Sequence, residues 1–393
     1  MLNTKTKRRQ AEKTKQIIGG ICGLILIMVV VMQFTQSSQE ISYYEAEQKA
    51  FSFSETLPEY TSINGDQIIR VTKDGINAYN VEGEEIWTDT LTLDNIVVRE
   101  REPYFAIANM NDRTIHLFSE KGREGEIIVE HPIVYFSLNH KGDVAVIQEL
   151  EEGHNISAYT LNGHPISGSR TTFIKNAGFP ISAEVSNDSQ MLIASYIDIY
   201  SPRITSVIVG MPIGITEPQA VDNITYGIEI KDNIIYDIEF ITDDLWVAVG
   251  EEGISYHNVS DGKRTIELPE TYLMQPPYIR NDNDKGYIAI VGKYVEQGSN
   301  TFGEQILWIY DKKGELVLEQ VFEQPIEFYK ASEKGVVIGQ GNNYEGYTPS
   351  GVHNFSFHST YQLEDIGYVS HELIAVTKNE VFNLKRVQKG TTE

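Results

Sequence analysis

Histidine and cysteine offer little for catalysis or metal binding in this chain. The nine histidines are scattered, and the closest pair, His353 and His358, is five residues apart. An odd spacing on a strand points two side chains to opposite faces of the sheet, so this pair is not expected to share a metal ion. The single cysteine, Cys22, excludes an intrachain disulfide and a thiol redox pair. The sequence therefore predicts no metal centre.

The acidic segment 281–286, NDNDKG, has the composition of a calcium loop. In an EF-hand frame that ends on Gly286, Lys285 occupies a ligand position and no glutamate follows in register, so a plain turn is favoured. The chain also lacks G-x-G-x-x-G, a Gly-Lys-Ser/Thr phosphate loop, H-E-x-x-H and G-x-S-x-G. We therefore expect no catalytic residues and no cofactor.

Trp87 follows a glycine turn in the pattern G-x-x-x-W, which is typical of quinone-cofactor propeller repeats. Trp246 and Trp308 do not reproduce that pattern in their own segments. All three tryptophans are therefore interpreted as core aromatics.

The elements that would position any site are indicated by one recurring phrase. An aromatic residue and a small polar residue are followed by two more residues and a glycine, at Gly83, Gly122, Gly163 and Gly314, and in a longer form at Gly262. Alternating apolar residues before the phrase predict a half-buried strand, and the polar residue and the glycine predict a tight turn. The first two gaps are 39 and 41 residues. A period near 40 of short strands is typical of propeller blades with four strands each.

The sequence thus predicts an all-β fold, a β-propeller of four-stranded blades in one domain over residues 56–388, with a tail at 389–393. Candidate inner strands include IVVRER (96–101), IYDIEFI (235–241) and IEFYKAS (326–332). Eight such units can be counted, and eight blades is the favoured number. Seven is the alternative, if the weakest unit, at 326–362, is an insertion.

The last unit, near 364–388, stops after its third strand. Its missing outer strand is expected from residues 43–54, within a juxtamembrane segment at 35–55. Closing the ring in this way leaves no exposed strand edge, which would otherwise be a site of aggregation.

The N-terminus has the features of a membrane anchor. Residues 17–34 are strongly apolar, and no charge occurs between Gln16 and Gln39. A run of this length predicts one transmembrane helix that is longer than the apolar part of a signal peptide. Six basic residues precede it, so residues 1–16 are predicted to be a cytoplasmic tail and the propeller to be extracytoplasmic, on the outer side of the cell membrane.

The body of the chain is acidic. The whole sequence has a formal net charge of −24, although its first 15 residues carry six basic side chains and one glutamate. An acidic surface repels phosphate backbones, so nucleic acid is not expected as a partner.

Candidate binding residues come from long connections that are predicted between second and third strands. These are ELEEGHN (149–155), DIYSPR (198–203), YVEQGSNTFGE (294–304) and GQGNNYEGYTPSGVH (339–353). Long loops on a rigid scaffold often carry binding groups. The last two contain aromatic residues of the kind that are enriched at interfaces, and we expect a partner to bind at Tyr294, Phe302, Tyr344 and Tyr347.

The sequence resembles a family of uncharacterised, membrane-anchored proteins of Firmicutes, the domain of unknown function family 5711. The resemblance is carried by KDGINAYNVEGEEIW (73–87), PIVYFSLNHKGDVAVI (132–147), ISAEVSNDSQMLIASYI (181–197), DIEFITDDLWVAVGEEGI (237–254) and HELIAVTKNEVFNLK (371–385). It implies a basic tail, one span and an extracytoplasmic propeller, and it supplies no catalytic residues. The architecture is also similar to quinoprotein-like and WD40-like propellers, but fold does not fix function.

Two classes of function follow. The favoured prediction is a binding or scaffolding module of the cell envelope, whose partner is an envelope protein, a peptide or a glycan. The alternative is an extracytoplasmic hydrolase or lyase that acts on cell-wall polymer with carboxylates around the central channel. Inward-facing acidic and basic residues with shifted pKa values would favour the enzyme, and an apolar or plugged channel would argue against it.

Overall fold

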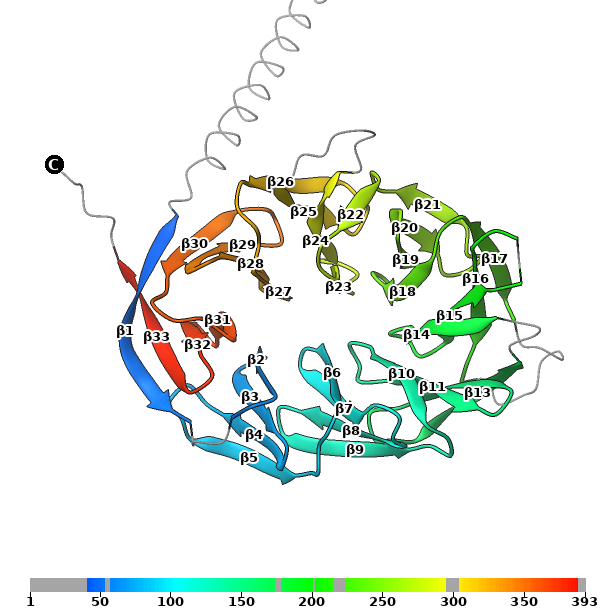
Figure 1. The fold of residues 1–393 in the computed structure, drawn as a ribbon, viewed down its shortest axis with the longest axis horizontal. Helices are drawn as coiled ribbons and strands as arrows, with labels where there is room; N and C mark the ends of the chain where they lie inside the picture. The colour runs from blue at the N-terminus through cyan, green and yellow to red at the C-terminus, as the bar shows by residue number, and fades with distance from the viewer. Residues whose placement is uncertain are drawn as a thin grey trace, which may run out of the picture. The chain divides into compact units, whose positions relative to one another are not determined.

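We describe residues 41–53, 57–173, 178–200, 202–214, 224–294 and 304–387 of a computed structural model. Every regular element within these ranges is a β-strand, and the strands are numbered β1 to β33. They form antiparallel sheets of four or five strands, and one eight-stranded sheet that joins two neighbouring groups of four, around a central axis (Figure 1). This arrangement is a β-propeller, as the alternating apolar pattern predicts.

The first four blades are regular, and each follows the chain from the axis outward. Blade 1 contains β2 (Tyr60–Asn64), β3 (Gln67–Thr72), β4 (Gly75–Tyr79) and β5 (Glu85–Thr90). Blade 2 contains β6 (Ile96–Arg101), β7 (Tyr104–Asn109), β8 (Thr114–Ser119) and β9 (Gly122–Ile128). Blade 3 contains β10 (Ile133–Leu138), β11 (Val144–Leu150), β12 (Gly153–Tyr159) and β13 (Pro165–Phe173). Blade 4 contains β14 (Phe179–Val185), β15 (Met191–Asp198), β16 (Thr205–Pro212) and β17 (Tyr226–Lys231).

Among the other blades, blade 6 has a divided inner strand. Blade 5 contains β18 (Ile235–Phe240), β19 (Leu245–Gly250), β20 (Gly253–Asn258) and β21 (Arg264–Glu267). Blade 6 contains β22 (Thr271–Leu273) and β23 (Tyr278–Arg280), which both pair with β24 (Tyr287–Tyr294), then β25 (Gln305–Asp311) and β26 (Leu316–Phe322). Blade 7 contains β27 (Phe328–Ser332), β28 (Gly335–Gln340), β29 (Asn343–Tyr347) and β30 (His353–His358). Blade 8 contains β31 (Asp365–Val369), β32 (Glu372–Val376), β33 (Glu380–Val387) and β1 (Ser42–Ser52).

Blade 8 joins the two ends of the described chain. Strand β1 pairs antiparallel with β33, from Tyr43 opposite Val387 to Ser52 opposite Glu380. The closing strand therefore comes from the N-terminal segment in which the sequence predicted it. The segment 326–362, which the seven-blade alternative treated as an insertion, contains all four strands of blade 7, so the described strands make eight groups.

The recurring phrase forms the turn between the third and fourth strands of a blade. In blade 1, the Asn80 side-chain oxygen accepts hydrogen bonds from the backbone N–H groups of Glu82 and Glu84, at 3.1 and 2.8 Å. Gly83 then adopts a φ of +85°, which an L side chain would strain. Asp311 and Gly314 repeat the arrangement in blade 6, with a φ of +74° at the glycine.

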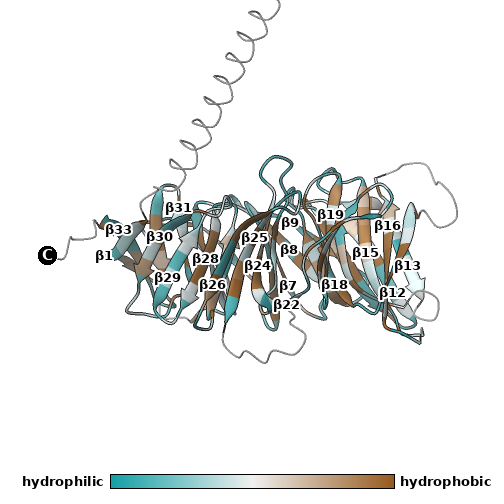
Figure 2. Ribbon diagram, turned by 90° about the horizontal axis from the view of Figure 1, so that it is seen from above, coloured by the Kyte–Doolittle hydropathy of each residue, from teal (hydrophilic) through white to brown (hydrophobic). Residues whose placement is uncertain are grey.

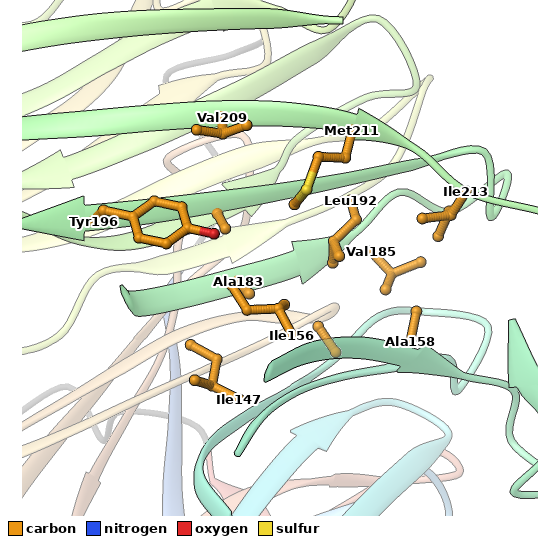
Figure 3. Close-up of a cluster of buried hydrophobic side chains, with 12 residues drawn as sticks. Ile147, Ile156, Ala158, Ala183, Val185, Leu192, Tyr196, Val209, Met211 and Ile213 are labelled. Atoms are coloured by element: carbon orange, nitrogen blue, oxygen red, sulfur yellow. The ribbon is translucent and has the colours of Figure 1, made fainter. Parts of the chain in front are cut away.

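The hydrophobic core lies between neighbouring blades. Figure 3 shows the cluster between blades 3 and 4, where Ile147 and Ile156 pack with Leu192, Tyr196 and other buried side chains. Seen edge-on, apolar colour is concentrated in the strands of the blades (Figure 2). Trp246 and Trp308 are fully buried and Trp87 stacks on Phe105 and Phe118, so the prediction of core aromatics is confirmed.

Two of the predicted long connections are wrong. Strands β11 and β12 are separated only by residues 151–152, and β28 and β29 only by 341–342. Gly341 has a φ of +55°, which permits so short a reversal. Some of the polar residues that suggested loops, such as Asn155 in β12 and Asn343 in β29, belong to the strands themselves.

The predicted transmembrane helix at 17–34 and the basic tail at 1–16 lie outside the described residues. In the ranges that the structure does describe, no helix has the length and apolarity needed to span a bilayer.

Candidate functional site

The inner strands carry charged side chains that converge near the ring axis. The first group, called here the Lys330 cluster, contains Lys330 (β27), Asp365 (β31), Ser62 (β2) and Glu100 (β6). These residues come from blades 7, 8, 1 and 2, which are consecutive around the ring. One cation from blade 7 is thus contacted by side chains from three other blades.

The contacts within the Lys330 cluster are close. Lys330 Nζ forms an ion pair with Asp365 and donates a hydrogen bond to Ser62 Oγ at 2.6 Å. Ser62 Oγ in turn donates to Glu100 Oε2 at 3.0 Å, and Asp365 also accepts from the backbone N–H of Ile63 at 2.6 Å. Burial alone would lower the pKa of Lys330, but Asp365 and Glu100 outweigh it and raise that pKa. Lys330 is therefore charged here, and Asp365, Ser62 and, at 4.0 Å, Glu100 surround its ammonium group.

The second group, called here the Arg101 cluster, connects blades 2, 4 and 5. Arg101, the last residue of β6, forms an ion pair with Glu239 of β18. Glu184 of β14 lies within the field of the same guanidinium and is only 4% exposed. Asp237 of β18 accepts hydrogen bonds from Ser182 Oγ at 3.3 Å and from the Tyr135 hydroxyl at 3.4 Å.

Carboxylates in the Arg101 cluster hold protons more tightly than usual. Burial raises the pKa of Glu184 to about 8, although Arg101 opposes the shift. Burial likewise raises the pKa of Glu239 to about 7, against the opposing effect of Arg101, and it raises the pKa of Asp237. The three carboxylates outnumber the Arg101 guanidinium and the more weakly acting Arg99, and their raised pKa values favour neutral forms that reduce the excess negative charge.

A cavity of about 240 Å³ lies beside both clusters, where blades 1, 2, 6 and 7 meet. Its lining combines acidic, basic and aromatic residues. They are Tyr60, Ile63, Glu100, Arg101, Glu102, Tyr278, Tyr329, Lys330, Ala331 and Ser332. Glu184, Asp237 and Glu239 are not part of this lining.

Two of the lining carboxylates have no matching cation of their own. Lys330 and Arg101 are already paired with Asp365 and Glu239. Within the described ranges Glu102 makes no ion pair, and Lys330 Nζ approaches Glu100 only to 4.0 Å. Burial, followed by the charge of Glu333, raises the pKa of Glu102, and burial raises the pKa of Glu100. The cavity therefore favours positively charged groups and hydrogen-bond donors.

The predicted aromatic contact residues do not gather into one site. Tyr344 and Tyr347 lie in β29 and are only 2% and 3% exposed, because they pack into the cores beside blade 7. Their prediction as exposed loop residues is wrong. Tyr294 ends β24 and is 39% exposed, with its hydroxyl donating to Glu319. Phe302 lies outside the described residues.

Sequence reasoning missed the residues that do converge. The strands IVVRER, IYDIEFI and IEFYKAS contain Glu100, Arg101, Asp237, Glu239 and Lys330. Charged residues at the centre of predicted inner strands were the available signal, since a buried charge needs a partner. The partners themselves lie on other blades, so spacing along the chain cannot reveal them.

No group of histidine, cysteine, aspartate and glutamate that could hold a metal ion occurs among the residues for which coordinates are described. The segment 281–286 is a turn, as predicted. Asp282 Oδ1 accepts hydrogen bonds from the backbone N–H groups of Asp284 and Lys285, at 2.8 and 2.9 Å. That carboxylate stabilises the turn.

The radial sheets and their charged inner strands define a β-propeller with a polar axis. The chain belongs to DUF5711, a family of unknown function, whose match covers residues 28–385. A search of curated proteins found no relative.

Several solved structures are similar in fold. BamB from Moraxella catarrhalis is 11% identical with a TM-score of 0.47, over 88% of this chain and 99% of that one. Hsv2 from Kluyveromyces lactis is 14% identical with a TM-score of 0.45, over 78% and 98% of the two chains. The WD40 domain of Neurospora crassa Pan2 is 10% identical with a TM-score of 0.43, over 75% and 89%. At such identities the similarity concerns the fold alone.

Proposed function

We propose that this protein is a membrane-anchored, extracytoplasmic binding or scaffolding module of the cell envelope, and that it binds its partner at the ring axis. The observation that carries the proposal is the 240 Å³ cavity, where Glu102 makes no ion pair within the described ranges and Glu100 only shares Lys330 with Asp365. Clefts with a few convergent polar groups are the usual places where ligands bind.

The chemistry of the cavity favours a basic segment of an envelope protein or peptide. An incoming ammonium or guanidinium group would neutralise Glu102 and relieve its proximity to Glu333. Tyr60 and Tyr278 line the same space, and aromatic rings attract cations. The acidic body of the chain would assist such a partner by long-range attraction.

The placement outside the membrane rests on the sequence. The apolar run at 17–34 is long enough to span a bilayer, and six basic residues precede it, which favours a cytoplasmic N-terminus. The propeller would then face the cell wall or the extracellular space.

Affinity capture from membranes tests the binding proposal. The full chain and a Glu102→Lys variant would each be used as bait, and recovered proteins quantified by mass spectrometry. We expect a partner that the wild type recovers at least tenfold better than the variant, and whose recovery falls as salt is raised. Glu270→Lys, at an exposed residue away from the cavity, is the matched control and should not change recovery. Equal recovery by the wild type and Glu102→Lys, or repeated recovery of no partner, would contradict the proposal.

A second candidate function is favoured by the pKa values in the Arg101 cluster. A carboxyl with a pKa of about 8 beside one with a pKa of about 7 can supply a general acid and a general base near neutral pH. A wall-polymer hydrolase or lyase would use such a pair. Against it, neither Glu184 nor Glu239 lines the cavity, and Glu239 is already paired with Arg101.

One assay distinguishes the binding module from the wall-polymer enzyme. If the chain is an enzyme, the purified protein should release soluble fragments from cell-wall preparations, and Glu184→Gln should abolish the release. A binding module should release none, with either sequence.

A further inference from the structure

A second cavity, of about 680 Å³, lies at the outer part of blade 3, where the segment after β9 of blade 2 borders it. It is separate from the ring axis, and its lining combines neutral polar side chains with apolar ones. The polar side chains include Gln148 of β11, Asn155, Ser157 and Tyr159 of β12, and Thr171 of β13. Its volume is within the range of small-molecule binding sites.

The cavity exists because blade 3 carries polar residues where its neighbour carries apolar ones. In blade 4, Tyr196 is paired with Val207 and Ala194 with Val209, and these side chains belong to or pack against the cluster between blades 3 and 4, in which Figure 3 labels Tyr196 and Val209. At the matching register of blade 3, Gln148 is paired with Asn155 and Val146 with Ser157. The polar set therefore replaces Tyr196, Val207 and Val209.

These replacements are ordered by one hydrogen-bond network. Gln148 Nε2 donates to Asn155 Oδ1 and to Ser157 Oγ, both at 3.1 Å. Asn155 Nδ2 donates to Thr171 Oγ1 at 3.2 Å, and Ser157 Oγ donates to the Tyr159 hydroxyl at 3.4 Å. Gln148 and Ser157 are only 4% and 6% exposed, so the base of the cavity is fixed before any ligand arrives.

The network ends in two hydroxyl groups that can still donate a hydrogen bond. The hydroxyls of Thr171 and Tyr159 each accept a bond from the network, and each keeps its own proton for a ligand. Ile128, which is 68% exposed, and Ile166 supply apolar surface on the same cavity. The lining thus offers hydrogen-bond donors and acceptors next to apolar side chains.

The charged groups of the lining restrict the class of ligand that this cavity can bind. Among its described residues the lining has no lysine or arginine for a phosphate or carboxylate, and its acidic and imidazole side chains are Glu130 and His131. Strands β11 and β12 are interior to the sheet and their backbone groups pair with neighbours, so a peptide cannot bind them by adding a strand.

We infer that this cavity is a binding site for a neutral oligosaccharide. Sugar hydroxyls both donate and accept hydrogen bonds, which matches the amides and hydroxyls of the network. The apolar faces of sugar rings can pack on Tyr159 and the two isoleucines. The site does not depend on the proposed function at the ring axis.

Saturation-transfer NMR on the full chain in lipid nanodiscs tests the inference, since nanodiscs avoid glycosidic detergents that would compete. The probes are chitotetraose and maltotetraose at millimolar concentration. We expect saturation transfer to at least one of them, with affinity about tenfold weaker in Gln148→Leu/Ser157→Val. Thr171→Val, at an exposed edge of the network, should weaken binding by about threefold and guards against misfolding of the double variant.

Gln340→Leu is the matched control, because Gln340 follows Val336 and Ile338 in blade 7 as Gln148 follows Val144 and Val146 in blade 3. Gln340→Leu should bind the sugars as the wild type does. Glu102→Lys, which changes only the cavity at the ring axis, should also bind them as the wild type does. The inference is overturned if neither sugar shows saturation transfer, or if both the double variant and Thr171→Val bind like the wild type. It is also overturned if a neutral Gly-Ser-Asn peptide binds with the same sensitivity and the sugars do not.

Discussion

Arg101 at the end of β6 forms an ion pair with Glu239 of β18, so one guanidinium connects blade 2 to blade 5 past two intervening blades. Adjacent blades are held by apolar side chains between their sheets, but this contact reaches across the axis of the ring. Together with Lys330 and Asp365, it makes the inner strands of the propeller interdependent.

Removing the guanidinium should be costly. Arg101→Met leaves Glu239, Glu184 and Asp237 buried around a missing cation, and the loss of one partner of a buried pair typically costs about 3–5 kcal/mol. The urea midpoint of unfolding should fall accordingly. Arg264→Met breaks an exposed pair with Glu267 and should cost less than about 1 kcal/mol. Equal midpoints for the two variants would show that the ion pair across the axis does not stabilise the ring.

The pKa of Glu184 makes a prediction about pH. Its ordinary value is 4.5 and its folded value is about 8. Between them the folded protein holds a proton that the unfolded chain releases, so stability falls as pH rises through this window. His140 acts in the opposite direction below pH 6.5, because burial lowers its pKa to about 4 and only the unfolded chain is then protonated.

Between pH 6.5 and 8, the pH dependence of stability therefore reports on the buried carboxylates and not on His140. As the pH rises from 6.5 to 8, deprotonation of Glu184 should lower the free energy of unfolding of the wild type by up to about 2 kcal/mol. Glu184→Gln should flatten the dependence and leave the contributions of the other buried carboxyls, Glu239 among them. Urea unfolding at several pH values measures this. A slope in Glu184→Gln as steep as that of the wild type would refute the assignment.

Closure of the ring by β1 predicts the effect of two truncations. A chain that starts at residue 57 lacks β1 and leaves β33 without its neighbour. An open strand edge pairs readily with other chains, so this protein should melt at lower temperature and form oligomers during size-exclusion chromatography. A chain that starts at residue 41 keeps β1 and should remain a monomer. Identical behaviour of the two truncations would mean that β1 does not close the propeller.

The glycine of the recurring phrase can be tested at Gly163. Its φ is +77°, and a Cβ there would lie 2.0 Å from the carbonyl oxygen of Glu126 in the neighbouring blade. Gly163→Ala combines strain with a clash and should cost more than about 2 kcal/mol. Gly341 has a φ of +55° but open space around it, so Gly341→Ala should cost only about 1 kcal/mol. Equal losses of stability would mean that the approach between blades is unimportant.

Much of the fold is predictable because strand and turn signals are local. Consecutive β-branched residues in segments such as IVVRER favour a strand, and a polar residue followed by glycine predicts the turn after β4 or β25. Loop length is less predictable. NYEGY is polar and contains glycine, which is typical of a loop, yet Tyr344 and Tyr347 lie on opposite faces of β29 and pack into the cores on the two sides of blade 7.

The candidate site was not predictable in the same way. Lys330 and Asp365 are 35 residues apart and Ser62 is 268 residues from Lys330, so the cluster exists only after the ring closes. The sequence shows that the predicted inner strands contain charged residues, but it does not show which blade supplies the partner of each buried charge. For the same reason the polar cavity on blade 3 becomes visible only when its register is compared with that of blade 4.

The central claim is that a partner binds at the ring axis. Photo-cross-linking in living cells tests it most directly, with a photoreactive amino acid at Ser332, which lines the cavity, and at Thr265, on the outer strand β21. We predict a discrete adduct of higher mass from position 332 and none from 265. The absence of an adduct at 332, or the same adducts from both positions, would contradict the claim.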